Sequence, residues 1–197
     1  VGNPYNQGYD RGPCTFNIGQ TFRFNAVYPL PFHGNRFVSG WQVSGIFGAT
    51  SGLPVNIQTG VFRTNLVGVQ GDRPDHSNAS GCNPDHILGR ADQWFDPACY
   101  LLQPLGTLGN VSRDSINGPG VINLDMALLK QTRVSEKLDT QFRFEVFNVP
   151  NHPNLWQPVN AIFTGGGPSL SVNPLAGRIL TTSTPSRQLQ FGLKLIF

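Results

Sequence analysis

The residues with the chemistry to hold a metal ion lie in one polar segment. Pro74-Asp75-His76 recurs ten residues later as Pro84-Asp85-His86, and Asp72 is close by. Imidazole and carboxylate groups gathered in one segment can coordinate a divalent cation. The spacing lacks the short, regular intervals of a tight metal site, however, so the pattern favours an ordinary polar loop. We therefore predict no metal, and leave open whether His76 and His86 bind one.

The chain shows no set of catalytic residues. It has no Gly-x-Ser-x-Gly, no His-Glu-x-x-His and no phosphate-binding loop. We therefore expect neither enzymatic activity nor a cofactor. The formal net charge is only +3, and no cluster of Lys and Arg could follow a phosphate backbone. Nucleic acid is therefore not an expected partner.

Two of the three cysteines are placed to form a disulfide. Cys82 and Cys99 lie in one segment rich in Gly, Pro, Asn and Asp, and their spacing suits a loop-closing bond. An oxidising compartment would favour that bond, whereas two free thiols in a reducing compartment are the alternative. We predict the disulfide, and assign no role to Cys14.

Elsewhere in the chain apolar and polar residues alternate with a period of two, which predicts strands. The final stretch, residues 187–197, shows the alternation most clearly, with Leu189, Phe191 and Leu193 on one face and Gln188, Gln190 on the other. Such a pattern predicts a strand with one apolar and one polar face. Further strands are predicted at residues 21–32, 41–57 with a kink at 51–54, 123–131 and 138–149.

The connections between these strands alternate in length. Short turns are predicted at residues 33–36 and 135–137, whereas residues 60–120 and 150–185 show no periodicity and are crowded with turn formers. A structureless loop of this length counts against an ordinary compact domain. It is typical of the external loops of a membrane β-barrel, whose periplasmic turns are short.

Several motifs, taken in order, point to a known family. The last strand, ending on Phe197, looks like the closing strand of a Gram-negative outer-membrane β-barrel. Together the motifs resemble the C-terminal end of TonB-dependent outer-membrane receptors of the Oar-like kind, which pair a carboxypeptidase-regulatory-like domain with a plug and a large barrel. The other motifs are Asp10-Arg-Gly-Pro13, Gly40-Trp-Gln-Val-Ser-Gly45 with Ser51-Gly-Leu-Pro54, Trp94-Phe-Asp-Pro-Ala-Cys99, Gly118-Pro-Gly120 with Asn123-Leu-Asp125, and Phe142-Arg-Phe-Glu-Val-Phe-Asn148 with Asn151-His-Pro-Asn154.

The resemblance implies an all-β fold in the bacterial outer membrane. Residues 1–197 would form the C-terminal segment of a transmembrane barrel, an antiparallel up-and-down meander of about five strands. The implied partners are the remaining barrel and plug, outer-membrane lipid, the barrel-assembly machinery reading Phe197, and an energy-coupling protein that acts through a missing N-terminal part. No plug and no segment for a TonB-like protein is visible in the sequence, so the transport machinery itself is not carried over.

In this reading the two faces of the strands have different surroundings. The polar face would line the lumen, although cross-strand pairing that stabilises the wall is the role the pattern favours for it. The predicted lumen-facing residues are Arg23, Asn25, Asp125, Arg143, Glu145, Gln190 and Lys194. The predicted lipid-facing residues are Phe22, Phe24, Trp41, Phe47, Leu124, Leu128, Phe142, Phe144, Leu189, Phe191, Leu193 and Leu195.

Two other functions stay open on the sequence alone. Strands with unpaired edges could assemble with one another into a structural or fibrous β-sheet protein without transport activity. A soluble β-sandwich binding module would also explain alternating strands and long loops. It would leave the terminal Phe197 and the alternation of loop lengths unexplained.

Overall fold

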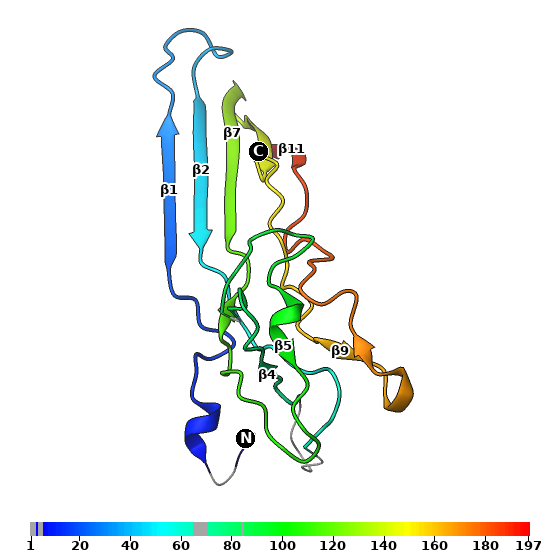
Figure 1. The fold of residues 1–197 in the computed structure, drawn as a ribbon. Coiled ribbons are helices and arrows are strands. Elements are labelled where there is room, and N and C mark those ends of the chain that lie inside the picture. Colours follow the sequence, from blue (N-terminus) through cyan, green and yellow to red (C-terminus); the bar gives the residue numbers. More distant parts are fainter. Residues whose placement is uncertain (1–2, 4–5, 65–70, 84) are drawn as a thin grey trace. The chain divides into compact units, whose positions relative to one another are not determined.

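The computed structural model describes residues 3, 6–64, 71–83 and 85–197 (Figure 1). The chain divides into two compact units. The sheet unit comprises Gln20–Thr50, Val121–Asn154 and Thr182–Phe197, and the loop unit comprises Val1–Gly19, Ser51–Gly120 and Leu155–Thr181. Within the described residues no helix is long and apolar enough to cross a membrane. The helices there are single 3₁₀ turns: η1 (Gln7–Asp10), η2 (Pro97–Cys99) and η3 (Gly167–Ser169).

The sheet unit is one antiparallel sheet, in which β1, β2 and β7 lie side by side in Figure 1. If the short strands of the loop unit are left aside, each strand of this sheet pairs with the next one along the chain. This is the up-and-down order predicted from the sequence. The all-β, antiparallel fold class is thereby confirmed. In spatial order the strands are β1 (Thr21–Pro29), β2 (Trp41–Thr50), β7 (Val121–Ser135), β8 (Leu138–Phe147) and β11 (Gln188–Ile196).

The register brings residues of like polarity together across the sheet. Phe24 lies opposite Phe47, which lies opposite Leu124. Farther along, Phe144 and Phe191 lie opposite each other, and their rings stack with centroids 4.8 Å apart. Cross-strand aromatic pairs of this kind stabilise a sheet. The alternation in the sequence is therefore matched by pairing that keeps one face apolar.

The turns between strands follow the predicted pattern of short and long connections. In the 30–40 turn, the side chain of Asn35 accepts hydrogen bonds from the backbone N–H groups of Phe37 (3.0 Å) and Val38 (3.2 Å). The β7–β8 turn is short. Both long connections leave and re-enter the same end of the sheet, because Thr50 pairs with Val121 and Phe147 with Gln188.

The prediction that the second strand continues through Ile57 is wrong. β2 ends at Thr50, and a separate short strand, β3 (Pro54–Val55), pairs with β6 (Ile116–Asn117) in the loop unit. Between them the chain passes so close to Gly118 that a Cβ added at Gly52 would overlap its backbone carbonyl. Only glycine fits such an approach, which gives a physical reason for the Ser51-Gly-Leu-Pro54 and Gly118-Pro-Gly120 motifs.

The loop unit has a hydrophobic core, which the sequence pattern did not predict. Ile57, Phe95 and Ile162 are fully buried, although they come from distant parts of the chain. Two-residue strands contribute Tyr100 and Phe163 to this core: β4 (Asp75–His76) pairs with β5 (Tyr100–Leu101), and β9 (Phe163–Thr164) with β10 (Ser171–Val172). Residues 65–70 of the predicted first loop lie outside the described residues.

A disulfide between Cys82 and Cys99 closes part of the loop unit, as the sequence predicted. The two Cα atoms are 5.1 Å apart, within the usual range for this bond. Cys99 is buried in the core and continues directly into Tyr100, whose ring meets Phe95 edge-on. Burial raises the pKa of the Tyr100 hydroxyl above its usual value, and the carboxylates of Asp85 and Asp96 raise it further.

Candidate functional site

The apolar face of the sheet unit is exposed. Phe22 is 60%, Phe191 68% and Leu193 71% accessible to solvent. A soluble β-sandwich would bury such side chains under a second sheet, so this exposure contradicts the sandwich reading. Contiguous apolar surface of this kind marks a membrane or partner contact. All of the residues predicted to face lipid lie on this face by register; their contact with lipid stays a prediction.

One cation lies on the apolar face, and sequence reasoning missed it. Lys130 pairs with Trp41 on one side and Phe142 on the other, so it takes the phase of the apolar set. Its ammonium group is nevertheless satisfied, because it donates to the backbone carbonyls of Arg36 (2.8 Å) and Ser39 and lies 5.6 Å from the Trp41 ring centroid. A long side chain that carries its charge to polar groups at a strand end is the expected arrangement near a membrane interface. The sequence contained a signal for this placement, because Lys130 comes two residues after Leu128 and so continues the apolar phase of the strand.

The polar face carries all of the residues predicted to line a lumen. Across the sheet, Asp125 shares this face with Asn25 through Ile46, and Glu145 lies opposite Gln190. Arg143 and Glu145 form an ion pair at 3.6 Å along one strand. Arg23 and Lys194 have the same phase on the two edge strands, opposite Gly48 and Gln141. Glu145 and Gln190 are thus cross-strand neighbours, whereas the Arg143–Glu145 ion pair lies within β8. The lumen assignment stays a prediction.

Three asparagines organise the end of the sheet unit where the long connections begin. Asn148 and Asn151 have φ angles of 52° and 53°, a left-handed conformation that asparagine tolerates better than most residues. The Asn148 amide donates to the carbonyls of His152 (3.1 Å) and Pro185 (3.2 Å). Asn154, which is fully buried, accepts from the Ile122 N–H (2.8 Å) and donates to its carbonyl (2.9 Å). The asparagines thus tie the connection after β8 to β7 and to the segment before β11.

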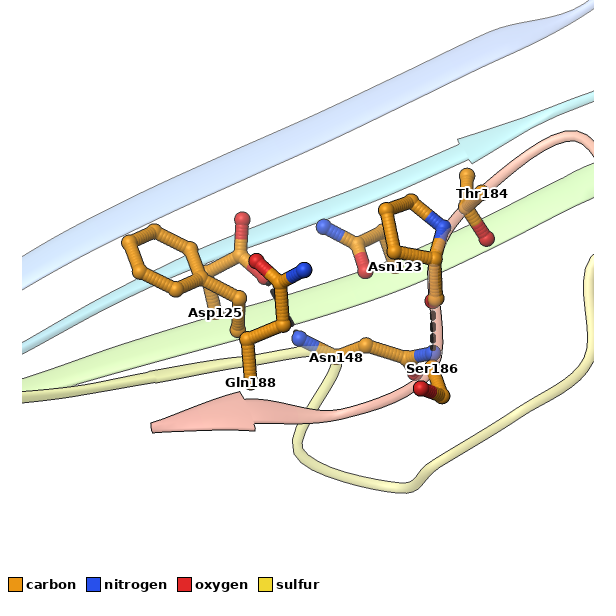
Figure 2. Close-up of a pocket in the computed structure, with 8 residues that line it drawn as sticks. Asn123, Asp125, Asn148, Thr184, Ser186 and Gln188 are labelled. Atoms are coloured by element: carbon orange, nitrogen blue, oxygen red, sulfur yellow. Dashed lines mark hydrogen bonds between the residues drawn. The ribbon is translucent and has the colours of Figure 1, made fainter. Parts of the chain in front are cut away.

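These contacts shape a pocket of roughly 240 Å³ on the polar face (Figure 2). One oxygen of Asp125 accepts the Asn148 N–H at 2.9 Å, which fixes the strand end against the pocket floor. Thr184 is held by a hydrogen bond from Asn154 at 2.9 Å. The lining residues come from β7, the end of β8 with the residue after it, and the segment that leads into β11: Asn123, Asp125, Phe147, Asn148, Thr184, Pro185, Ser186 and Gln188.

The two Pro-Asp-His segments make different hydrogen bonds. The Asp75 carboxylate accepts the Asn110 N–H at 2.9 Å, and the His76 N–H donates back to the Asn110 side chain at 2.7 Å. The His86 N–H instead closes a turn with the Asn83 carbonyl. In the described residues no three His, Cys, Asp or Glu side chains are grouped to hold a metal ion. Pro84 lies outside those residues.

Thiol labelling can test whether Leu193 and Lys194, on opposite faces of the sheet, face lipid and water respectively. In a Cys14→Ser background, we expect Lys194→Cys in membrane vesicles to react with a water-soluble methanethiosulfonate reagent. Leu193→Cys should react at least about tenfold more slowly, because the reactive thiolate forms poorly in lipid. Equal labelling rates at the two positions would contradict the lipid and lumen assignments. Heat-dependent gel mobility of the folded protein provides the control for correct assembly.

Comparison with known proteins agrees with the geometry of the sheet. A family model described as an outer membrane beta barrel domain matches residues 1–190 of the chain. No match was found among curated proteins or among solved structures. The family match covers most of the chain, and the antiparallel sheet with one exposed apolar face is what such a domain requires. The chain therefore belongs to the outer membrane β-barrel domain family, which places it in the bacterial outer membrane.

Proposed function

We propose that this chain is a wall segment of a TonB-dependent outer-membrane receptor or transporter, without catalytic activity of its own. The observation that carries the proposal is the open sheet, whose edge strands are β1 and β11. A sheet cannot leave its edge N–H and C=O groups unpaired in lipid. The neighbouring strands would come from the remainder of the receptor barrel, around a plug that an energy-coupling protein acts upon.

The loop unit is the part proposed to contact ligand outside the cell. Its core and its disulfide give residues 51–120 and 155–181 a defined shape. A preorganised surface binds with a smaller loss of conformational entropy than a flexible loop does. In this proposal Phe197, which is 93% exposed, is the signal read by the barrel-assembly machinery.

The proposal is tested by the sidedness of the two kinds of connection. We expect Leu105→Cys, in the loop unit, to react with a membrane-impermeant maleimide on intact cells, because Leu105 is 70% exposed. Glu136→Cys, in the exposed β7–β8 turn, should react only after the outer membrane is permeabilised. Both variants carry Cys14→Ser so that only the new thiol reacts.

The reverse labelling pattern would overturn the external assignment of the loop unit. The same open edges also favour a second function, edge-to-edge assembly into a structural β-sheet protein. That function would give large, detergent-resistant particles in the electron microscope and no dependence of labelling on permeabilisation. Recovery of the chain within a single barrel-sized species would count against it.

A further inference from the structure

The pocket at the end of β7, β8 and β11 has polar groups that the fold does not use. The amides of Asn123 and Gln188 and the hydroxyl of Ser186 have no hydrogen-bond partner among the described residues, and the hydrogen bond to Asn148 occupies only one oxygen of Asp125. Figure 2 shows these side chains around the pocket. Amide groups both donate and accept, whereas the carboxylate only accepts. The pocket therefore offers both kinds of hydrogen bond to one ligand.

The backbone at the rim of this pocket is held by hydrogen bonds within the protein. Asn148 contributes no free donor, because its amide is spent on the His152 and Pro185 carbonyls. Figure 2 shows the hydrogen bond between Asn148 and Asp125 as a dashed line. A site whose backbone is held in this way is preorganised, so little ordering is needed on binding.

The charge and shape of the pocket narrow the class of ligand. Its lining includes no Arg or Lys, and its single carboxylate, Asp125, repels anions. The Phe147 ring, 37% exposed, supplies an apolar surface beside the amides. At roughly 240 Å³, the pocket is below the range of about 300–1,000 Å³ typical of drug-sized ligands, which suits a single ring.

We infer that this pocket binds one residue of a neutral saccharide. Sugar hydroxyls both donate and accept, so they match the amides of Asn123 and Gln188 and the carboxylate of Asp125, and the C–H face of a sugar ring can lie on Phe147. A longer glycan has room to continue over β2, because a side chain at Gly48, the cross-strand partner of Asn123, would meet no atom within 4 Å. The inference rests on the proposed function only in that the polar face must be reached by ligand.

The test is saturation-transfer NMR on the membrane-extracted protein in detergent. The probes are glucose, galactose, mannose and N-acetylglucosamine, each added alone. We expect transfer to at least one sugar. Asn123→Ala and Gln188→Ala should each weaken the affinity by roughly tenfold, since each removes hydrogen bonds to the ligand. Gln141→Ala, an amide on the same face but outside the pocket, is the matched control and should bind as the unaltered protein does.

Three results would overturn the saccharide site. They are no transfer to any of the four sugars, equal loss of binding in Gln141→Ala, and binding of inorganic phosphate or calcium in place of sugar. Heat-dependent gel mobility confirms that each variant is folded. The receptor proposal fails separately, through the labelling of Leu105→Cys and Glu136→Cys, so the two failures are distinguishable.

Discussion

Replacing Arg73 with alanine is expected to release the N-terminal segment of the loop unit. The Arg73 guanidinium lies 3.8 Å from the Tyr9 ring centroid and donates to the Tyr9 carbonyl at 2.7 Å. It also forms an ion pair with Asp10 at 3.4 Å, and Arg73 itself is only 5% exposed. Removing one partner of a largely buried charge pair costs about 3 kcal/mol, because the groups that it contacted lose a charged partner in a poorly solvated place.

The release is measured by trypsin cleavage after Arg11, which is exposed and directly follows Tyr9 and Asp10. Where opening is fast relative to cleavage, a loss of about 3 kcal/mol corresponds to roughly 100-fold faster cleavage. Arg73→Lys keeps the charge but loses the planar stacking on the Tyr9 ring. Its rate of cleavage should therefore lie between those of the unaltered protein and Arg73→Ala.

Arg90→Ala is the matched control, because Arg90 pairs with Asp92 at 3.4 Å but both side chains are largely exposed. Exposed pairs contribute little to stability, so cleavage after Arg11 should not change in this variant. If Arg73→Ala and Arg90→Ala changed the rate of cleavage equally, the contacts of Arg73 with Tyr9 and Asp10 would not be what holds the N-terminal segment in place. Two separate contacts involve the Asp10-Arg-Gly-Pro13 motif. Asp10 pairs with Arg73, and a Cβ at Gly12 would lie 2.5 Å from the Arg113 carbonyl oxygen.

The strands of the sheet unit were predictable because their signal is local. Alternation over residues 187–197 predicts both a strand and its two faces, and the observed strand is Gln188–Ile196. The short turn before Leu138 was predictable for the same reason. The predicted ends of the strands differ from the observed ends by only a few residues. For example, β1 ends at Pro29 instead of near residue 32. In each case neighbouring residues in the sequence carry the information.

The loop unit was not predictable because its core is assembled from scattered residues. Ile57, Phe95, Val111 and Ile162 are each at most 1% exposed, yet they lie far apart in the sequence, and β7 and β8 of the sheet unit come between Val111 and Ile162. No period links them, since the strands in this unit are only two residues long. Arg73 is similar, because its partner Tyr9 is 64 residues away in the chain.

The candidate site was predictable in part. Alternation placed Asp125 and Gln190 on the polar face, and the register agrees. The pocket itself depends on Asn148 and Asn151 in left-handed conformations, which a sequence pattern does not specify. The Asn151-His-Pro-Asn154 motif was visible, but its function in tying strand ends together follows only from the hydrogen bonds of Asn148 and Asn154.

Removal of the disulfide is expected to open the segment that it closes. Cys82 and Cys99 are separated by 17 residues, and a cross-link closing a loop of this size contributes about 3 kcal/mol. The Ser77 N–H donates to the Cys99 carbonyl at 2.9 Å, so its exchange with solvent reports whether this segment opens. In the Cys82→Ser, Cys99→Ser double variant we expect exchange of the Ser77 amide to be roughly 100-fold faster.

The control is Cys14→Ser, which removes an exposed free thiol and should leave exchange at Ser77 unchanged. The amide of Val149, which donates to the Leu124 carbonyl in the sheet unit at 2.8 Å, should be unaffected in both variants. Slow exchange at Ser77 in the double variant would mean that the core around Phe95 and Tyr100 holds this segment without the covalent bond. Faster exchange at Ser77 alone, with Val149 unchanged, would show that the loop unit owes its shape to the cross-link and opens independently of the strands in the membrane.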